Sequence, residues 1–194
     1  MSIEGLKEDA GFAWPPRKKG YCGLGNSPSV LHDFLTTGNP DGVKDELRRF
    51  KNLPGHLQLV AQNLGDQDIF SKTVADHYWL GYRNFKLTHN YYVLEDGITD
   101  LNGINLCLIR SGIIVEVHPQ TVTAKASILV RRGNNVNLVD EHQTISYDPA
   151  IITNLNPDLM IAFHWGEITK TITPAENRTL VSGTEEILSR LKLN

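Results

Sequence analysis

The chain has few cysteines, no excess of basic residues and no long apolar run, and each lack excludes a class of protein. Its 194 residues include two cysteines, Cys22 and Cys107, which excludes a disulfide framework and a four-cysteine zinc site. Nineteen Lys and Arg against 22 Asp and Glu give a net charge of -3, without the basic excess of a nucleic-acid-binding protein. No segment approaches the ~20 apolar residues of a membrane span, and no signal peptide is recognisable. We therefore expect a cytoplasmic protein with neither a membrane nor a nucleic acid as partner.

The sequence also lacks the common catalytic and nucleotide-binding motifs. It contains no P-loop, no Gly-x-Ser-x-Gly elbow, no His-Glu-x-x-His and no Cys-x-x-Cys. Gly20, Gly23 and Gly25 do not follow a strand at dinucleotide-binding spacing, so we expect no nucleotide cofactor. No two of the seven histidines stand at a local metal-binding spacing. Any site must therefore be assembled by the fold.

The first half of the chain has the pattern of a bundle of short helices. Apolar residues recur at spacings of three and four between proline and glycine signals. Four helices are predicted within residues 27–84, beginning at Ser27-Pro28, Asn39-Pro40, Pro54-Gly55 and near Ile69. Residues 1–26 are predicted to be irregular, because Trp14-Pro15-Pro16 should not continue a helix.

Near residue 95 the apolar period changes from helical to strand-like. Leu106 to Val117 is a run rich in β-branched residues and is predicted to be the first strand. Further strands are predicted at residues 121–130, 136–139, 144–147 and 159–164. Short strands without intervening helices favour a small antiparallel barrel. Thr173-Pro174-Ala175-Glu176 is a capping box that should start a final helix.

The change of period predicts an α+β protein with two domains. Residues 1–95 would form a small N-terminal α-helical domain. Residues 104–194 would form a small antiparallel β-barrel of OB-like type, followed by a C-terminal helix. The stretch EDGITDLNG, residues 95–103, is the best candidate for the linker.

Two residues of the predicted barrel are candidates for chemistry. Cys107 and His164 each lie in or beside an apolar strand, and a barrel brings strands that are distant in sequence side by side. A thiolate and an imidazole suit a soft metal such as low-spin iron, and they equally suit a nucleophilic cysteine with a histidine base. A buried cysteine is also a common apolar filler. The residues alone leave these alternatives open.

Two motifs around these residues resemble a known family. LCLIRSGIIVEV, residues 106–117, resembles the N-terminal signature of the HypC-type NiFe-hydrogenase maturation chaperones, with Cys107 at the position of the family cysteine. PDLMIAFHWGEITKTI, residues 157–172, is similar to a later segment of that family, with His164 at the position of its histidine. The chain departs from the pattern because Cys107 is internal and Ser111 stands where the family has proline.

The resemblance implies a non-enzymatic maturation factor. HypC-type chaperones are held to carry an Fe(CN)2CO fragment from the scaffold protein that builds it to the hydrogenase large subunit. Carried over by position, Cys107 would be the thiolate ligand of the iron, and His164 a ligand or an orienting partner. The implied protein partners are the maturation scaffold protein, the hydrogenase large subunit, or both. The alternatives are an enzyme with Cys107 or Cys22 as nucleophile and a non-catalytic adaptor.

If Cys107 and His164 form one site, three expectations follow. The sulfur and an imidazole nitrogen should lie within roughly 4 to 7 Å of each other at one end of the barrel. The site should be open to solvent or to a docking partner, because a carrier must release its cargo. Cys22 would then be either a packing residue of its glycine-rich loop or an additional ligand at the same site.

The whole chain also resembles a family of longer proteins of unknown function that accompany hydrogenase genes. GYCGLG around Cys22 and ADHYWLGYRN at residues 75–84 carry this resemblance. The longer relatives have an additional His-rich helical stretch between the helical half and the barrel, which this chain lacks. For the helical half, the resemblance implies membership of a family and no chemistry.

Overall fold

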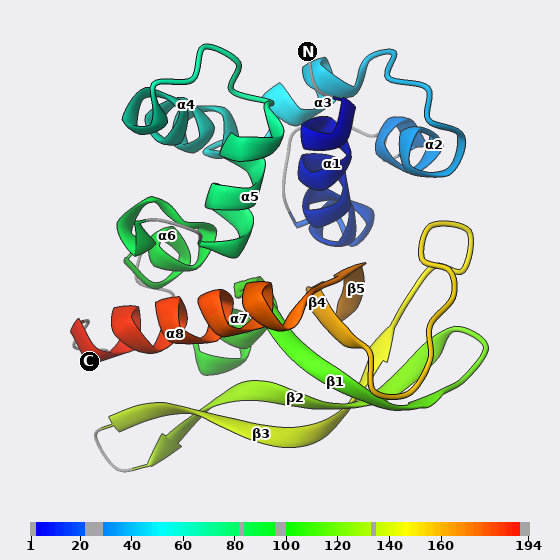
Figure 1. Ribbon diagram of the computed structural model, residues 1–194, viewed down its shortest axis with the longest axis vertical. Helices are drawn as coiled ribbons and strands as arrows, with labels where there is room; N and C mark the ends of the chain where they lie inside the picture. Colours follow the sequence, from blue (N-terminus) through cyan, green and yellow to red (C-terminus); the bar gives the residue numbers. More distant parts are fainter. Residues whose placement is uncertain (1–2, 22–28, 82–83, 96–99, 133–134, 191–194) are drawn as a thin grey trace. The chain divides into compact units, whose positions relative to one another are not determined.

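A computed structural model describes most of the chain as two compact units (Figure 1). The units are Met1–Trp79 and Leu80–Asn194. The described residues are 3–21, 29–81, 84–95, 100–132 and 135–190. The fold is α+β, as predicted, with N-terminal helices, a ring-like sheet and a C-terminal helix. The division into folding domains at 1–95 and 104–194 stays a prediction.

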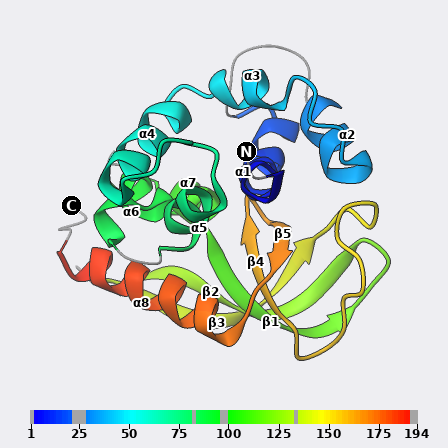
Figure 2. The same ribbon diagram turned by 45° about the horizontal axis from the view of Figure 1, so that its top comes forward.

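The first unit consists of short helices (Figure 2). They are α1 (Ile3–Lys18), α2 (Ser29–Thr37), α3 (Val43–Arg48), α4 (Leu53–Leu64) and α5 (Lys72–Leu80). The last four fall within the region 27–84, where helices were predicted. The start predicted at Ser27-Pro28 lies outside the described residues.

Helix α1 lies where we predicted irregular structure, so that prediction is wrong. Pro15 and Pro16 are inside the helix, close to its C-terminal end. Each proline removes the amide donor that would bond the carbonyl four residues earlier, so the helix loses two backbone hydrogen bonds near its C-terminal end. The helix also buries Leu6 and Phe12, and tertiary packing of this kind supplies most helical stability in proteins.

Two buried polar contacts join helices of the first unit. The indole Nε1 of Trp79 donates a hydrogen bond of 2.7 Å to Oδ1 of Asp9, which is fully buried. Burial raises the pKa of the Asp9 carboxyl well above its ordinary value, and the nearby acidic side chains act in the same direction. Arg17 forms a buried ion pair with Glu46 at 2.7 Å.

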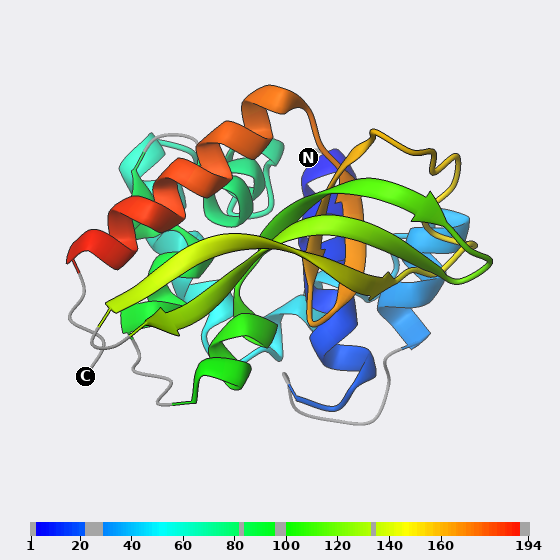
Figure 3. The same ribbon diagram turned by 90° about the horizontal axis from the view of Figure 1, so that it is seen from below.

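The second unit contains a five-stranded sheet and the remaining helices. Its elements are η1 (Phe85–Leu87), α6 (His89–Glu95), α7 (Leu101–Cys107), β1 (Arg110–Val117), β2 (Thr121–Arg132), β3 (Asn135–Ser146), β4 (Met160–His164), β5 (Glu167–Thr171) and α8 (Pro174–Arg190). Figure 3 shows how the long, twisted strands β2 and β3 run beside β1. None of the described helices of the chain is both long and apolar enough to span a membrane.

The strands pair in a closed ring in the order β1-β2-β3-β5-β4. The described pairs are antiparallel except for β3 with β5, which are parallel and joined at one register position, Ser146 opposite Glu167. The sheet is therefore ring-like, and its closure is less extensive than that of a fully paired barrel. Buried apolar side chains fill it: Ile114, Val122, Ala124, Ala126, Ile145, Ile161, Phe163 and Ile168.

The capping box predicted for α8 is present. The Thr173 hydroxyl accepts a hydrogen bond from the Glu176 amide at 3.2 Å, and the Glu176 carboxylate accepts one from the Thr173 amide at 2.6 Å. The helix buries Leu180, Thr184 and Ile187. It packs against β1, β3 and β4 and thus covers one side of the sheet (Figure 1).

Three strand predictions need correction. Leu106 and Cys107 are helical, because α7 begins at the N-cap Asp100 and extends through Cys107; the first strand begins at Arg110. The predicted linker thus overlaps a helix at residues 101–103. The two short strands predicted at 136–139 and 144–147 are parts of one strand, β3, whose pairing with β2 continues without interruption. Strand β5 was not predicted as a separate element.

Candidate functional site

A tight hairpin positions His164. This residue ends β4, and Trp165 and Gly166 form the turn into β5 with φ values of 54° and 72°. Positive φ at both turn residues is typical of the two-residue turns that match the twist of a hairpin. His164 pairs with Glu167 across the turn, and each is only 3% exposed. The strand predicted at residues 159–164 was the last one expected, but β5 follows His164.

Cys107 lies at the end of a helix instead of in a strand. It is the last residue of α7 and is half-buried. Two buried residues, Leu108 and Ile109, connect it to β1. The thiol therefore lies at a helix-to-strand junction, and the contacts of this junction determine its position.

The first turn of α6 is hydrogen-bonded to that junction. Thr88 caps the helix, since its hydroxyl accepts a hydrogen bond from the Tyr91 amide at 3.2 Å. The buried side chain of Asn90 then bonds both backbone groups of Ile109: Oδ1 accepts from the amide and Nδ2 donates to the carbonyl, each at 2.8 Å. Nδ2 also donates to the Thr184 hydroxyl of α8 at 3.0 Å. One asparagine thus joins α6, α8 and the start of β1.

His89 contacts both predicted site residues. Its Nε2 lies 3.0 Å from the carbonyl oxygen of Cys107. A carbonyl oxygen only accepts hydrogen bonds, so Nε2 carries the proton and donates. The His89 ring also packs against the His164 ring, with centroids 5.0 Å apart and planes at 77°. The structure therefore brings Cys107 and His164 to the same histidine.

Two further contacts attach α7 to the sheet. The Asn105 side chain accepts a hydrogen bond from the Leu129 amide at 2.8 Å and donates one to the Leu129 carbonyl at 3.0 Å. The Trp165 amide of the hairpin turn donates to the Leu106 carbonyl at 3.0 Å. The segment around Cys107 is thus bonded to β2 through the Asn105 side chain, and its backbone is bonded to the hairpin and to α6.

The predicted openness of the site stays a prediction. His164 is buried, and Cys107 is half-buried. The predicted distance between the sulfur and the imidazole stays a prediction. Cys22 lies outside the described residues. Among the residues that the structure describes, no three His, Cys, Asp or Glu side chains gather as a metal site would require.

Sequence reasoning missed His89 and Asn90. The cue was Thr88, a good N-cap residue, which would put the next two residues in the first turn of a helix. That cue predicts where a helix starts, but it does not predict which residues the helix contacts. The contact between His89 and Cys107 joins positions 18 residues apart and depends on how α6 meets the sheet.

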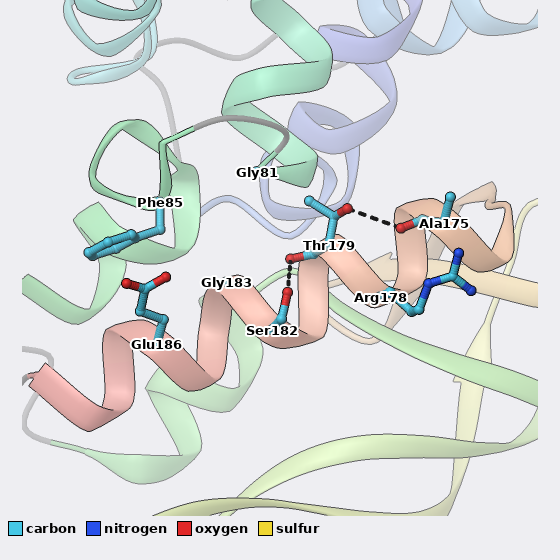
Figure 4. A pocket seen from close by; sticks show the side chains of 8 residues that line it. All are labelled: Gly81, Phe85, Ala175, Arg178, Thr179, Ser182, Gly183 and Glu186. Carbon is cyan, nitrogen blue, oxygen red and sulfur yellow. Dashed lines mark hydrogen bonds between the residues drawn. The ribbon is translucent and has the colours of Figure 1, made fainter.

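A groove of about 440 Å³ runs along α8, and Cys107, His164 and His89 are not among the residues that line it. Figure 4 shows its small and polar lining, with Phe85 and Glu186 pointing toward one another. The hydroxyls of Thr179 and Ser182 donate to carbonyls of their own helix, at 3.0 Å and 3.3 Å. Neither a cysteine nor a histidine lines the groove. We therefore place the candidate site at the α7–β1 junction.

Comparison with known proteins identifies a family. The model described as "Family of unknown function (DUF6390)" matches residues 1–96 and 92–193. The chain belongs to this family. No curated protein and no solved structure matches the chain. Membership of DUF6390 covers almost the whole chain and assigns no activity, so the hydrogenase association is carried by the sequence motifs alone.

Proposed function

We propose that this DUF6390 protein is a hydrogenase maturation factor. It binds an Fe(CN)2CO-type fragment as cargo through Cys107 and His164. It docks on the maturation scaffold protein, on the hydrogenase large subunit, or on both in turn. It acts in the cytoplasm, as a binding protein without a nucleotide cofactor. The motif resemblance to HypC-type chaperones supplies the cargo and the partners in this proposal.

The observation that supports the proposal is the position of His89. The Cys107 motif and the His164 motif are far apart in the sequence, yet His89 contacts a residue of each. Such proximity is required of two residues that share one cargo, whereas two unrelated packing residues need not share a neighbour. The bonds from Asn90 and Trp165 hold the same junction in place.

The chemistry of the two side chains suits this cargo. A thiolate is a strong donor to low-spin iron, and an imidazole can ligate iron or donate a hydrogen bond to a cyanide. The fragment brings cyanide and carbon monoxide ligands of its own, so it needs few protein ligands. A site with only two such groups, one of them half-buried, also suits a carrier that must release what it holds.

The decisive experiment is isolation of the full chain after co-expression with a hydrogenase maturation scaffold protein. We expect iron bound to the chain, together with infrared bands of cyanide and carbon monoxide. The variants Cys107→Ser and His164→Ala should lose both signals. The matched control is His142→Ala, which removes an exposed histidine of β3 and should retain them. Absence of iron and bands from the wild-type chain, or their retention in Cys107→Ser, would contradict the proposal.

The same preparation separates the two alternatives. A cysteine-dependent enzyme predicts a chain without iron whose Cys107 reacts with iodoacetamide much faster than an ordinary thiol. A pure adaptor predicts ordinary thiol reactivity, no iron, and partner binding that survives Cys107→Ser. The proposed carrier differs from both because cargo and thiol are lost together.

A further inference from the structure

We infer that His89 is the third member of this site, a positioning residue that holds Cys107 and His164 in a fixed relation to each other. The inference rests on the proposed function for its cargo. It goes beyond that proposal by assigning a role to a residue outside both motifs, on a helix that precedes the strands. The carrier site would then consist of a thiol, a buried imidazole and a second imidazole that contacts both.

The first step of the argument is the hydrogen bond to Cys107. Carbonyl groups in the last turn of a helix have no partner within the helix. The Cys107 carbonyl belongs to the last residue of α7, and the Nε2–H group of His89 satisfies it at 3.0 Å. Because the thiol is attached to the same residue, this bond restricts how the end of α7 can move. His89 thereby limits the directions open to the Cys107 side chain.

The second step is the ring contact with His164. Aromatic rings whose centroids are about 5 Å apart favour an edge-to-face arrangement, and the two imidazoles are tilted by 77° at 5.0 Å. His164 is buried, so rotating its ring would require His89 to move as well. A ligand or hydrogen-bond donor with few available rotamers is pre-organised for its cargo.

The third step is that His89 itself is held firmly. Thr88 on one side caps α6, and Asn90 on the other side bonds both the amide and the carbonyl of Ile109. The backbone of His89 is therefore tied to the segment that it positions. Its side chain supplies a donor to one candidate residue and a ring to the other.

These two roles can be separated by substitution. His89→Gln keeps a side-chain N–H donor for the Cys107 carbonyl but removes the ring that packs on His164. His89→Phe keeps a ring but removes the donor. If His89 only fills space, the effects of the two variants should follow side-chain volume and not which of the two contacts is kept. The same two substitutions at His142, which is exposed, serve as matched controls.

The experiment uses the full chain in a Cys22→Ser background, so that Cys107 is the single thiol. The rate of Cys107 alkylation by iodoacetamide reports the position of the thiol without any cargo. We expect His89→Phe to raise this rate several-fold, because the end of α7 loses a bond and exposes the sulfur. We expect His89→Gln to react at the wild-type rate.

The second readout uses the chain co-expressed with the scaffold protein. We expect His89→Phe to lower iron loading by about tenfold or more, the usual effect of losing an outer residue that orients a ligand. We expect His89→Gln to load iron but to shift the cyanide infrared bands, because His164 has lost its neighbouring ring. Both His142 variants should match the wild type in every measurement.

The outcomes distinguish the inference from the proposed function. A wild-type chain without iron contradicts the proposed function, and the alkylation rates still decide whether His89 positions Cys107. The inference is overturned if His89→Phe alkylates at the wild-type rate, or if the Gln and Phe variants are impaired equally. If His89→Phe fails to fold, as judged by circular dichroism, His89→Gln decides: unshifted cyanide bands, or an alkylation rate unlike that of the wild type, overturn it.

Discussion

Asn90 shows how a single side chain can replace a strand neighbour. Its amide group bonds the amide and the carbonyl of Ile109 in the same way as an adjacent strand would. The side chain is buried, so these bonds form away from water, where an unpaired backbone group costs about 1–3 kcal/mol. Together with His89, it makes the first turn of α6 part of the candidate site.

Asp9 illustrates the opposite case, because burial of this side chain favours its uncharged form. Its pKa is raised above the ordinary value of 3.8 by burial and by nearby acidic groups. A raised folded-state pKa means that the stabilising effect of the protonated group is present below pH 3.8 and is lost as the pH rises through the raised value. The wild-type chain should therefore lose stability as the pH rises above the pKa of an ordinary aspartate carboxyl.

We predict that Asp9→Asn is more stable than the wild type at neutral pH. Asparagine keeps an oxygen that accepts from Trp79 and has no proton to lose. The difference should vanish near pH 4, where the wild-type carboxyl is also protonated. Urea unfolding followed by tryptophan fluorescence at several pH values measures this. The control is Asp41→Asn, because Asp41 is exposed. An equal gain in stability in that variant would contradict the prediction.

Among the elements, β1 depends on a close approach to β2. Gly112 lies opposite Ala126, and a Cβ at this position would lie 2.8 Å from the Ala126 Cβ and 3.1 Å from the Lys125 carbonyl oxygen. These atoms belong to the backbone or its first side-chain carbon, so they cannot move without shifting the strand. The glycine therefore allows the sheet to curve into its ring at this point.

We predict that Gly112→Ala destabilises the protein by about 1–3 kcal/mol, the usual cost of overpacking. The matched control is Gly183→Ala in α8, where a Cβ would meet no atom within 4 Å. There the higher helix propensity of alanine should add about 0.5–1 kcal/mol. Denaturant unfolding of both variants measures the contrast. Equal stability of the two would show that the ring accommodates a methyl group at Gly112.

Helix α7, like α1, is an element that was not predicted from local sequence. Asp100 caps it by accepting hydrogen bonds from Asn102 and Gly103. The residues that follow include β-branched and apolar types that also suit a strand. In the fold, the two bonds between the Asn105 side chain and Leu129 hold α7 against β2. Since these partners are 24 residues apart, a local pattern does not contain this information.

At the scale of the whole molecule, the chain divides into two compact units that carry different features. The helical unit contains the buried acid Asp9, and the second unit contains the candidate site and Gly112. The resemblance to HypC-type chaperones covers the sheet and the C-terminal helix of the second unit, whereas membership of DUF6390 covers both units. The chemistry that we propose is therefore confined to the second unit.

We predict that the two units unfold independently, as separate domains should. Hydrogen exchange read by mass spectrometry at peptide resolution should show faster exchange in the second unit of Gly112→Ala and unchanged exchange in the first. Asp9→Asn at neutral pH should slow exchange in the first unit alone. Changes that spread across both units in either variant would identify a single cooperative domain.

Local sequence was sufficient to predict the α+β class, the helices between residues 29 and 80 and the start of α8. These depend on local period and on caps such as Thr173 with Glu176, whose partners are three residues apart. It also singled out Cys107 and His164, through motifs. The position of Cys107 at the end of a helix and the contacts of His89 with both residues are seen only in the folded chain. The physical reason is that these contacts join segments whose meeting depends on the closure of the sheet and on the packing of α6 and α7 against it.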